Sequence, residues 1–119
     1  ILLSACEKEN GERTWTKIDG IYTCEESSPH AGYKKYIVEI DKVRGQENTY
    51  IITNFHNAGN LEFLFMNLQN DSLKIENQVI GSLFINGKGK ISENFDQIEI
   101  EYTADDGQRE LDFFAVYTR

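Results

Sequence analysis

The chain has 119 residues, a formal net charge of −8 and 27% charged residues. This length suits a single domain. A chain this acidic lacks the basic face that nucleic acids or anionic lipid headgroups require, so neither is an expected partner. After Leu3 no apolar run is long enough for a membrane-spanning helix, and two cysteines do not make a disulfide scaffold.

The chain opens with an apolar stretch that ends in Leu3-Ser4-Ala5-Cys6, and charged residues follow. This order resembles the lipobox of bacterial lipoproteins, in which a signal peptidase cuts before the cysteine and a diacylglycerol is attached to its sulfur. The resemblance implies that residues 1–5 are a remnant of the signal peptide. It also implies that Cys6 carries the lipid, with further acyl chains such as palmitate securing a membrane anchor. The alternative is an ordinary N-terminal segment in which Cys6 forms a disulfide with Cys24.

Residues 6–14 are highly charged and show no apolar periodicity, so we expect a solvated tether after the lipidated cysteine. Glu7 rather than Asp follows Cys6, which by resemblance to Gram-negative sorting rules argues against retention in the inner membrane. Lys8-Glu9 resembles the export signal of Bacteroidetes surface lipoproteins, and chance charge in a linker explains it equally well. The expected location is the outer membrane, on its surface or its periplasmic face.

Residues 15–119 are expected to form the folded domain. Trp15 to Cys24 alternates apolar and polar residues, as a half-buried strand does, with Tyr22 and Cys24 on one face. If Cys6 is acylated, Cys24 is left as a small apolar core residue. Residues 25–32 hold the only proline and form the longest expected loop.

Three further strands are expected in the middle of the chain. The first carries Tyr36 on one face, and the second ends in a hairpin through residues 56–60. The third is apolar on both faces, with Phe63 and Phe65 on the same side, as in a strand that is covered on both sides. These strands span residues 33–43, 49–55 and 61–68.

The last part of the chain continues the pattern. Residues 73–75 and 79–85 read as strands, and Gly87-Lys88-Gly89 predicts a bulge or tight bend. Apolar and polar residues alternate over residues 97–103, and Tyr102 is expected to face inwards. The Asp-Gly pair within residues 105–107 is favoured in hairpin turns, and the final strand, residues 110–118, carries Phe113 on its apolar face.

About eight strands with short turns predict an all-β fold, an antiparallel meander that closes into a small barrel and so removes exposed edges. The alternative is an open β-sandwich. Eight strands enclose just enough room for side chains or one small ligand. The aromatic residues are either solid core or the lining of such a ligand site. The candidate lining residues are Tyr22, Tyr36, Phe63, Phe65, Tyr102 and Phe113.

The first strand, Trp15-x-x-Ile18-x-Gly20-x-Tyr22, is similar to the opening of lipocalin-like and avidin-like barrels. The runs within residues 73–78, 84–89 and 98–102 resemble small Bacteroidetes lipoproteins with lipocalin-like barrels. True lipocalins have Gly two residues before the Trp, where this chain has Arg13, which argues against ligand carriage. In lipocalins a C-terminal Arg packs over that Trp and plugs one end of the barrel. Arg119 either does the same here or is a frayed terminal residue.

The chain carries no nucleophile elbow, phosphate-binding glycine loop or His-Glu-x-x-His pair, so we expect no enzyme, no cofactor and no metal site. His30 and His56 fall in expected loops and read as polar loop residues. Glu25-Glu26 and Asp105-Asp106 read as solvated acidic turns, because neither has the spacing of a calcium loop. Ser72 lies in Asp71-Ser72-Leu73, which resembles an O-glycosylation signal of Bacteroidetes secreted proteins; the alternative is a plain turn serine.

These features favour a lipid-anchored barrel of the cell envelope with a non-enzymatic binding role. Its expected partners are the membrane, through the lipid on Cys6, and either a small apolar ligand or an envelope protein. One alternative is an inhibitor of a lysozyme or protease that uses residues 25–32 as a protruding loop. Another is a structural component of an outer-membrane complex.

Overall fold

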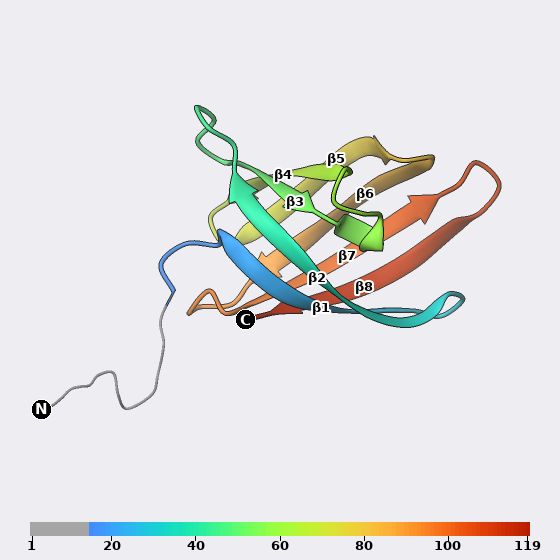
Figure 1. The fold of residues 1–119 in the computed structure, drawn as a ribbon, viewed down its shortest axis with the longest axis horizontal. Helices are drawn as coiled ribbons and strands as arrows, with labels where there is room; N and C mark the ends of the chain where they lie inside the picture. The colour runs from blue at the N-terminus through green and yellow to red at the C-terminus, as the bar shows by residue number, and fades with distance from the viewer. Residues whose placement is uncertain (1–14) are drawn as a thin grey trace, which may run out of the picture.

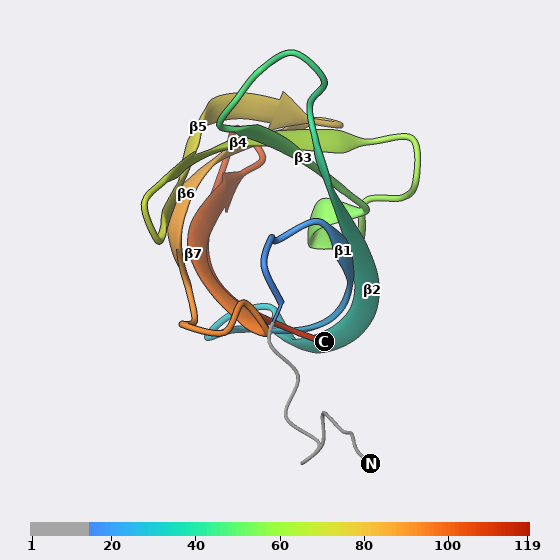
Figure 2. The same ribbon diagram turned by 90° about the vertical axis from the view of Figure 1, so that its left-hand side faces the viewer.

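The structure, a computed structural model, describes residues 15–119. The expected signal remnant, Cys6 and the tether lie outside this range. Eight antiparallel strands follow one another in a meander and close into a barrel by pairing β8 with β1 (Figures 1 and 2). The strands are β1 (Gly20–Ser28), β2 (Gly32–Lys42), β3 (Thr49–Thr53), β4 (Phe63–Gln69), β5 (Ser72–Ile80), β6 (Leu83–Ile91), β7 (Gln97–Asp105) and β8 (Glu110–Thr118).

This architecture confirms the all-β, lipocalin-like barrel and excludes the open sandwich. A short 3-10 turn, η1 (Phe55–Asn57), follows β3. Within residues 15–119 no helix is long and apolar enough to cross a bilayer.

The core is built from alternate residues of the strands, since successive side chains point to opposite faces. On β1 this places Tyr22, Cys24 and Glu26 inside the barrel. Within residues 15–119 Cys24 is a free thiol with no exposed surface, and burial raises its pKa to about 12. It is therefore a small residue of the core.

The prediction of a loop at residues 25–32 is wrong. β1 continues to Ser28, β2 begins at Gly32, and Ser28 pairs with Gly32, so residues 29–31 form the tip of a hairpin. The acidic pair belongs to the strand: Glu25 faces outwards and Glu26 inwards. The inhibitor alternative therefore has no long protruding loop in this segment.

The expected inward position of Phe63 and Phe65 is also wrong. Their side chains are 47% and 53% exposed on the outside of β4, whereas Leu64 and Met66 are buried inside. β4 is apolar on both faces, so alternation alone does not say which face is inside. The register with β3 decides it, because inward-facing Ile52 lies opposite Leu64.

The strand boundaries around residues 72–91 differ from the prediction. A turn at residues 81–82 divides the expected strand at 79–85, and the register shift lies in β5, between Ile75 and Gln78. β6 instead runs unbroken through Gly87 and Gly89. A Cβ at Gly87 would lie 2.3 Å from the Glu101 carbonyl oxygen and 2.6 Å from the Tyr102 Cβ. Glycine is thus needed there for a close approach of β6 to β7.

The pairing between β4 and β5 covers only three residue pairs, from Asn67–Lys74 to Gln69–Ser72. Beyond them the side-chain amide of Gln78 bridges the two strands. Its oxygen accepts from the Phe65 N–H at 2.8 Å, and its nitrogen donates to the carbonyls of Phe65 (2.8 Å) and Glu76 (3.0 Å). We refer to this part of the barrel, β4 residues 63–66 facing β5 residues 75–80, as the seam.

Arg119 plugs one end of the barrel. Its guanidinium lies 4.1 Å from the centroid of the Trp15 ring and 4.6 Å from that of Tyr22. It also donates hydrogen bonds to the carbonyls of Lys17, Asp19 and Phe95. The lipocalin-like contact of Arg119 with Trp15 is therefore present and the frayed terminus is excluded. We call this the plugged end and the opposite one, which holds η1, the η1 end.

Candidate functional site

A buried carboxylate lies inside the barrel near the η1 end. Glu26 is 2% exposed, and its Oε1 accepts hydrogen bonds from the hydroxyls of Tyr36 and Tyr102, each at 2.5 Å. His56 Nδ1 lies 2.5 Å from the Tyr102 hydroxyl oxygen and 3.7 Å from Glu26 Oε1. Because Tyr102 gives its one proton to Glu26, the hydrogen bond with His56 requires a proton on Nδ1.

These hydrogen bonds determine the charge of the cluster. Burial raises the pKa of Glu26, but the interaction with nearby His56 and the hydrogen bonds from Tyr102 and Tyr36 outweigh it and leave that pKa below its usual value. Burial raises the pKa of both tyrosines, and the nearby Glu26 adds to the rise at Tyr102. At neutral pH the cluster is thus an ionised carboxylate held by two neutral tyrosine donors.

η1 holds His56 over this end of the barrel in an unusual backbone conformation. Asn54, His56 and Asn57 all have positive φ, at 67°, 60° and 58°. Non-glycine residues adopt this region only when their surroundings hold them there. The Asn54 side chain contributes, since it donates to the Ile37 carbonyl at 2.7 Å and accepts from the Gly59 N–H at 2.8 Å. The strain is local to the segment that positions His56.

The interior aromatic residues pack on one another. The rings of Tyr102 and Phe113 stack with centroids 5.2 Å apart, and His56 contacts the Phe113 ring edge to face at 4.8 Å. Tyr22 lies at the plugged end beneath Arg119 and donates to the Ile18 carbonyl. Of the six aromatics expected to line the interior, four point inwards, and they divide between the two ends. A recess of about 150 Å³ beside His56 is lined by Leu83, Ala104, Asp106, Arg109, Leu111 and Phe113.

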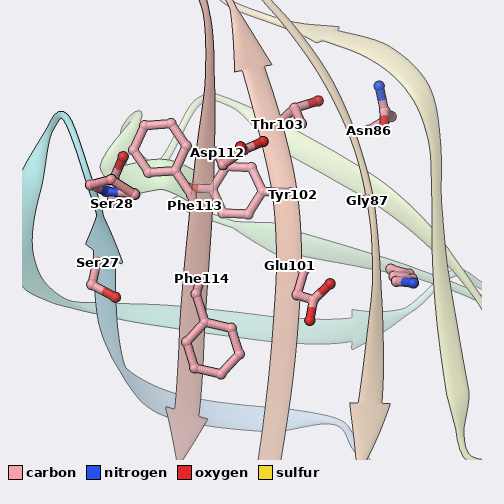
Figure 3. Close-up of a pocket in the computed structure, with 12 residues that line it drawn as sticks. Ser27, Ser28, Asn86, Gly87, Glu101, Tyr102, Thr103, Asp112, Phe113 and Phe114 are labelled. Atoms are coloured by element: carbon pink, nitrogen blue, oxygen red, sulfur yellow. The ribbon is translucent and has the colours of Figure 1, made fainter.

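A larger concavity, of about 800 Å³, lies over β6, β7 and β8 (Figure 3). Two cross-strand rows of outward-facing side chains line it, with the inward-facing row of Gly87, Tyr102 and Phe113 between them. Pro29, in the β1–β2 turn, also lines it. We call this concavity the groove. Its outward-facing rows are Asn86–Thr103–Asp112 and Lys88–Glu101–Phe114–Ser27.

The groove contains polar groups with unused hydrogen-bonding capacity. Ser28 Oγ and Thr103 Oγ1 are buried and have no hydrogen-bond partner among residues 15–119. The Phe114 ring, on the same surface, is 39% exposed. Buried polar groups in native proteins are nearly always satisfied, so the orphaned hydroxyl of outward-facing Thr103 beside an exposed ring points to a binding surface.

The other candidate residues named in the sequence analysis lie apart from the Glu26 cluster and the groove. His30 is exposed in the β1–β2 turn, and Ser72 is exposed at the first residue of β5, where its glycosylation stays a prediction. Asp106 accepts hydrogen bonds from the backbone N–H groups of Arg109 and Gln108, which lower its pKa, so it stabilises the hairpin turn. Within residues 15–119 no group of three or more His, Cys, Asp or Glu side chains is placed to hold a metal ion.

The sequence prediction missed Glu26, His56 and the groove. Glu26 had a local signal, because it continues the inward alternation of Tyr22 and Cys24. His56 had none, since its contact with Tyr102 joins residues 46 positions apart. The groove residues looked like the ordinary polar face of strands, and only the register of β6 to β8 gathers them.

No family model, no curated protein and no solved structure matches this chain.

Proposed function

We propose that this protein is a lipid-anchored β-barrel of the bacterial cell envelope that binds a ligand in the groove without transforming it. The observation that supports the groove as the binding surface is the buried, unpartnered hydroxyl of Thr103 on one of its outward-facing rows, beside the exposed Phe114 ring. Leaving such a group unsatisfied costs about 1–3 kcal/mol. A ligand that hydrogen-bonds to it would recover this free energy.

The packing of the interior supports a surface site over an internal one. Tyr36, Tyr102 and Phe113 contact one another or Glu26 and are each less than 10% exposed. A small apolar ligand inside would have to displace them. Glu26 lies inside the barrel and does not line the groove.

The position of the chain ends suits an anchored molecule. Trp15, the first described residue, contacts Arg119 at the plugged end. The β1–β2 and β7–β8 hairpin turns lie at the opposite end (Figure 1). A lipid on Cys6 would therefore hold the plugged end towards the membrane and leave the Ser28 side of the groove facing away from it.

The anchor is tested on the full-length precursor expressed in a Gram-negative bacterium. The wild-type protein is expected in the membrane fraction with a mass increased by a diacylglycerol and an acyl chain, whereas Cys6→Ser appears in the soluble fraction. Cys24→Ala is the matched control and should stay in the membrane. An unmodified Cys6, or a Cys6–Cys24 disulfide, would refute the anchor.

The groove is tested by native mass spectrometry of the protein extracted gently from its membrane. A bound ligand is expected on the wild-type protein and should be lost from Phe114→Ala. Phe84→Ala is the control, because Phe84 is an exposed β6 phenylalanine that does not line the groove. Retention of the ligand by Phe114→Ala would refute the groove as its site.

A second candidate function is a structural role in an envelope protein complex, favoured by large apolar side chains exposed on and near β4–β6. Contiguous exposed apolar surface commonly marks protein–protein contacts. Double substitution of Phe63 and Phe65 by Ser should then release a co-purifying envelope protein, whereas Ile21→Ser on β1 should retain it. The exposed residues are Leu61, Phe63, Phe65, Val79 and Phe84.

A further inference from the structure

The polar groups of the groove match the hydrogen-bonding chemistry of sugars. The hydroxyls of Ser27, Ser28 and Thr103 and the side-chain amide of Asn86 can each donate and accept a hydrogen bond. Sugar hydroxyls have the same dual capacity. The hydroxyl of outward-facing Thr103 is buried without a partner in the described chain, so its hydrogen-bonding capacity is unused.

The charges of the groove disfavour an anionic ligand. Lys88 lies directly opposite Glu101 in the register of β6 and β7, and Asp112 lies on the neighbouring strand. One positive and two negative groups thus line the groove of a chain whose net charge is −8. An anionic ligand such as a phosphate or a uronate would meet repulsion from both the groove and the whole molecule.

The exposed aromatic ring adds a platform for the apolar face of a sugar. Phe114 follows Glu101 in the same cross-strand row and leaves 39% of its surface to solvent. Pyranose rings present C–H groups on one face and hydroxyls around the edge. Such a ring can pack on Phe114 while its hydroxyls reach the polar side chains of the neighbouring row.

The backbone of the groove argues against a peptide ligand. β7 pairs with β6 over residues 98–105 and with β8 over residues 97–105, so its ladder is complete on both sides. A peptide strand that joins a sheet needs unpaired backbone groups at an edge. The centre of the groove offers side chains, and side-chain hydroxyl, amide and carboxylate groups are what sugar recognition uses.

From these four observations we propose that the groove binds a neutral oligosaccharide. This inference rests on the groove being the binding surface of the protein. Its volume of about 800 Å³ lies within the range of about 300–1,000 Å³ that is usual for ligand sites. The ligand would stack on Phe114 and hydrogen-bond to Asn86 and Thr103.

The proposal is tested by titrating the full-length protein with neutral hexasaccharides of glucose, mannose, galactose and N-acetylglucosamine, with dissociation constants from calorimetry. A hexasaccharide of galacturonic acid and an apolar hexapeptide serve as anionic and peptide controls. At least one neutral hexasaccharide should bind, and Phe114→Ala should weaken that binding tenfold or more. Phe84→Ala should change it less than twofold.

A second variant separates binding from folding. Thr103→Val removes an unpartnered hydroxyl and keeps the side-chain shape, so its thermal unfolding temperature should equal or exceed that of the wild-type protein. Its affinity for the hexasaccharide should nevertheless fall tenfold. Failure of every neutral hexasaccharide to bind, or tighter binding of either control ligand, would overturn the proposal.

The outcome also distinguishes this inference from the proposed function. A co-purified ligand that is not a sugar and is lost from Phe114→Ala would overturn the saccharide inference and keep the groove as the binding surface. A ligand retained by Phe114→Ala would overturn both.

Discussion

Glu26 is a buried charge that the barrel keeps because two tyrosine hydroxyls donate hydrogen bonds to it and His56 lies beside it. An ionised carboxylate without donors would be strongly destabilising inside a protein. Tyr36 reaches it from β2, Tyr102 from β7 and His56 from η1. The cluster therefore ties three separate parts of the barrel to β1.

Two tyrosines allow a matched test of this interaction. Tyr36→Phe removes a donor to a buried carboxylate and is expected to lower the free energy of unfolding by about 1–3 kcal/mol. Tyr117→Phe removes a fully buried hydroxyl that has no partner among residues 15–119, so its effect should be near zero or stabilising. Urea denaturation of both variants gives the comparison. Equal destabilisation would contradict the assignment of Tyr36 as a donor to Glu26.

The lowered pKa of Glu26 predicts a specific acid sensitivity. The unfolded carboxyl takes up a proton at a higher pH than the folded one, so its stabilising contribution is complete above about pH 4.5 and is lost as pH falls through the lower folded pKa. Glu26→Gln should be less stable than the wild-type protein at neutral pH, and the difference should shrink on acidification. Urea denaturation at several pH values measures it. A difference that stays constant between pH 7 and pH 3 would contradict the ionised state of Glu26.

At the level of elements, β6 shows how a single position shapes the sheet. Gly87 allows the β7 backbone to approach so closely that a Cβ would overlap the Glu101 carbonyl oxygen. Because β6 and β7 are paired on both sides of this point, neither strand can move away without losing ladder hydrogen bonds. The glycine is therefore a requirement of the pairing between β6 and β7, two of the strands that line the groove.

Gly87→Ala should accordingly destabilise the barrel by more than about 2 kcal/mol, in the range of overpacking substitutions. Gly89→Ala should cost less, because its nearest atom, the Glu99 carbonyl oxygen, would lie 2.8 Å away rather than 2.3 Å. Lys90→Ala, at an exposed site on the same strand, is the control. Thermal unfolding monitored by circular dichroism should rank the three in that order, and the opposite ranking of the glycines would contradict the close approach.

The inward face of a strand was predictable from the sequence where the other face is polar, and it was not predictable where both faces are apolar. Tyr36 on β2 and Tyr102 on β7 alternate with exposed residues, so their inward position followed from period two. On β4 the faces of Phe63 and Leu64 are equally apolar, and only pairing with β3 separates them. The groove and the Glu26 cluster join residues from distant strands, which no local pattern specifies.

On the scale of the whole molecule, Arg119 closes the barrel where residues 15–119 begin and end. One guanidinium contacts two aromatic rings and bonds to carbonyls of the segment before β1 and of the β6–β7 turn. This joins the two ends of the folded chain, which the pairing of β1 with β8 also brings together.

Arg119→Ala should lower the free energy of unfolding by about 2–4 kcal/mol, because it removes several charge-assisted hydrogen bonds and two cation–π contacts. Arg109→Ala, which removes the same charge from the β7–β8 turn, should change it by less than about 0.5 kcal/mol, as is usual for surface substitutions. Guanidinium denaturation measures both. Similar changes in the free energy of unfolding for the two variants would contradict the role of Arg119 in stabilising the plugged end.

The seam between β4 and β5 is the strand boundary at which we expect the barrel to open first. Three ladder pairs and one side-chain amide hold this boundary, whereas β7 and β8 share nine pairs. The least protected boundary exchanges its amide protons through local opening rather than global unfolding. The Phe65 amide should therefore exchange with deuterium faster than that of Ile100, and faster still in Gln78→Ala. Each such opening would briefly offer solvent a bare edge flanked by Phe63 and Phe65, the combination from which protein aggregates start.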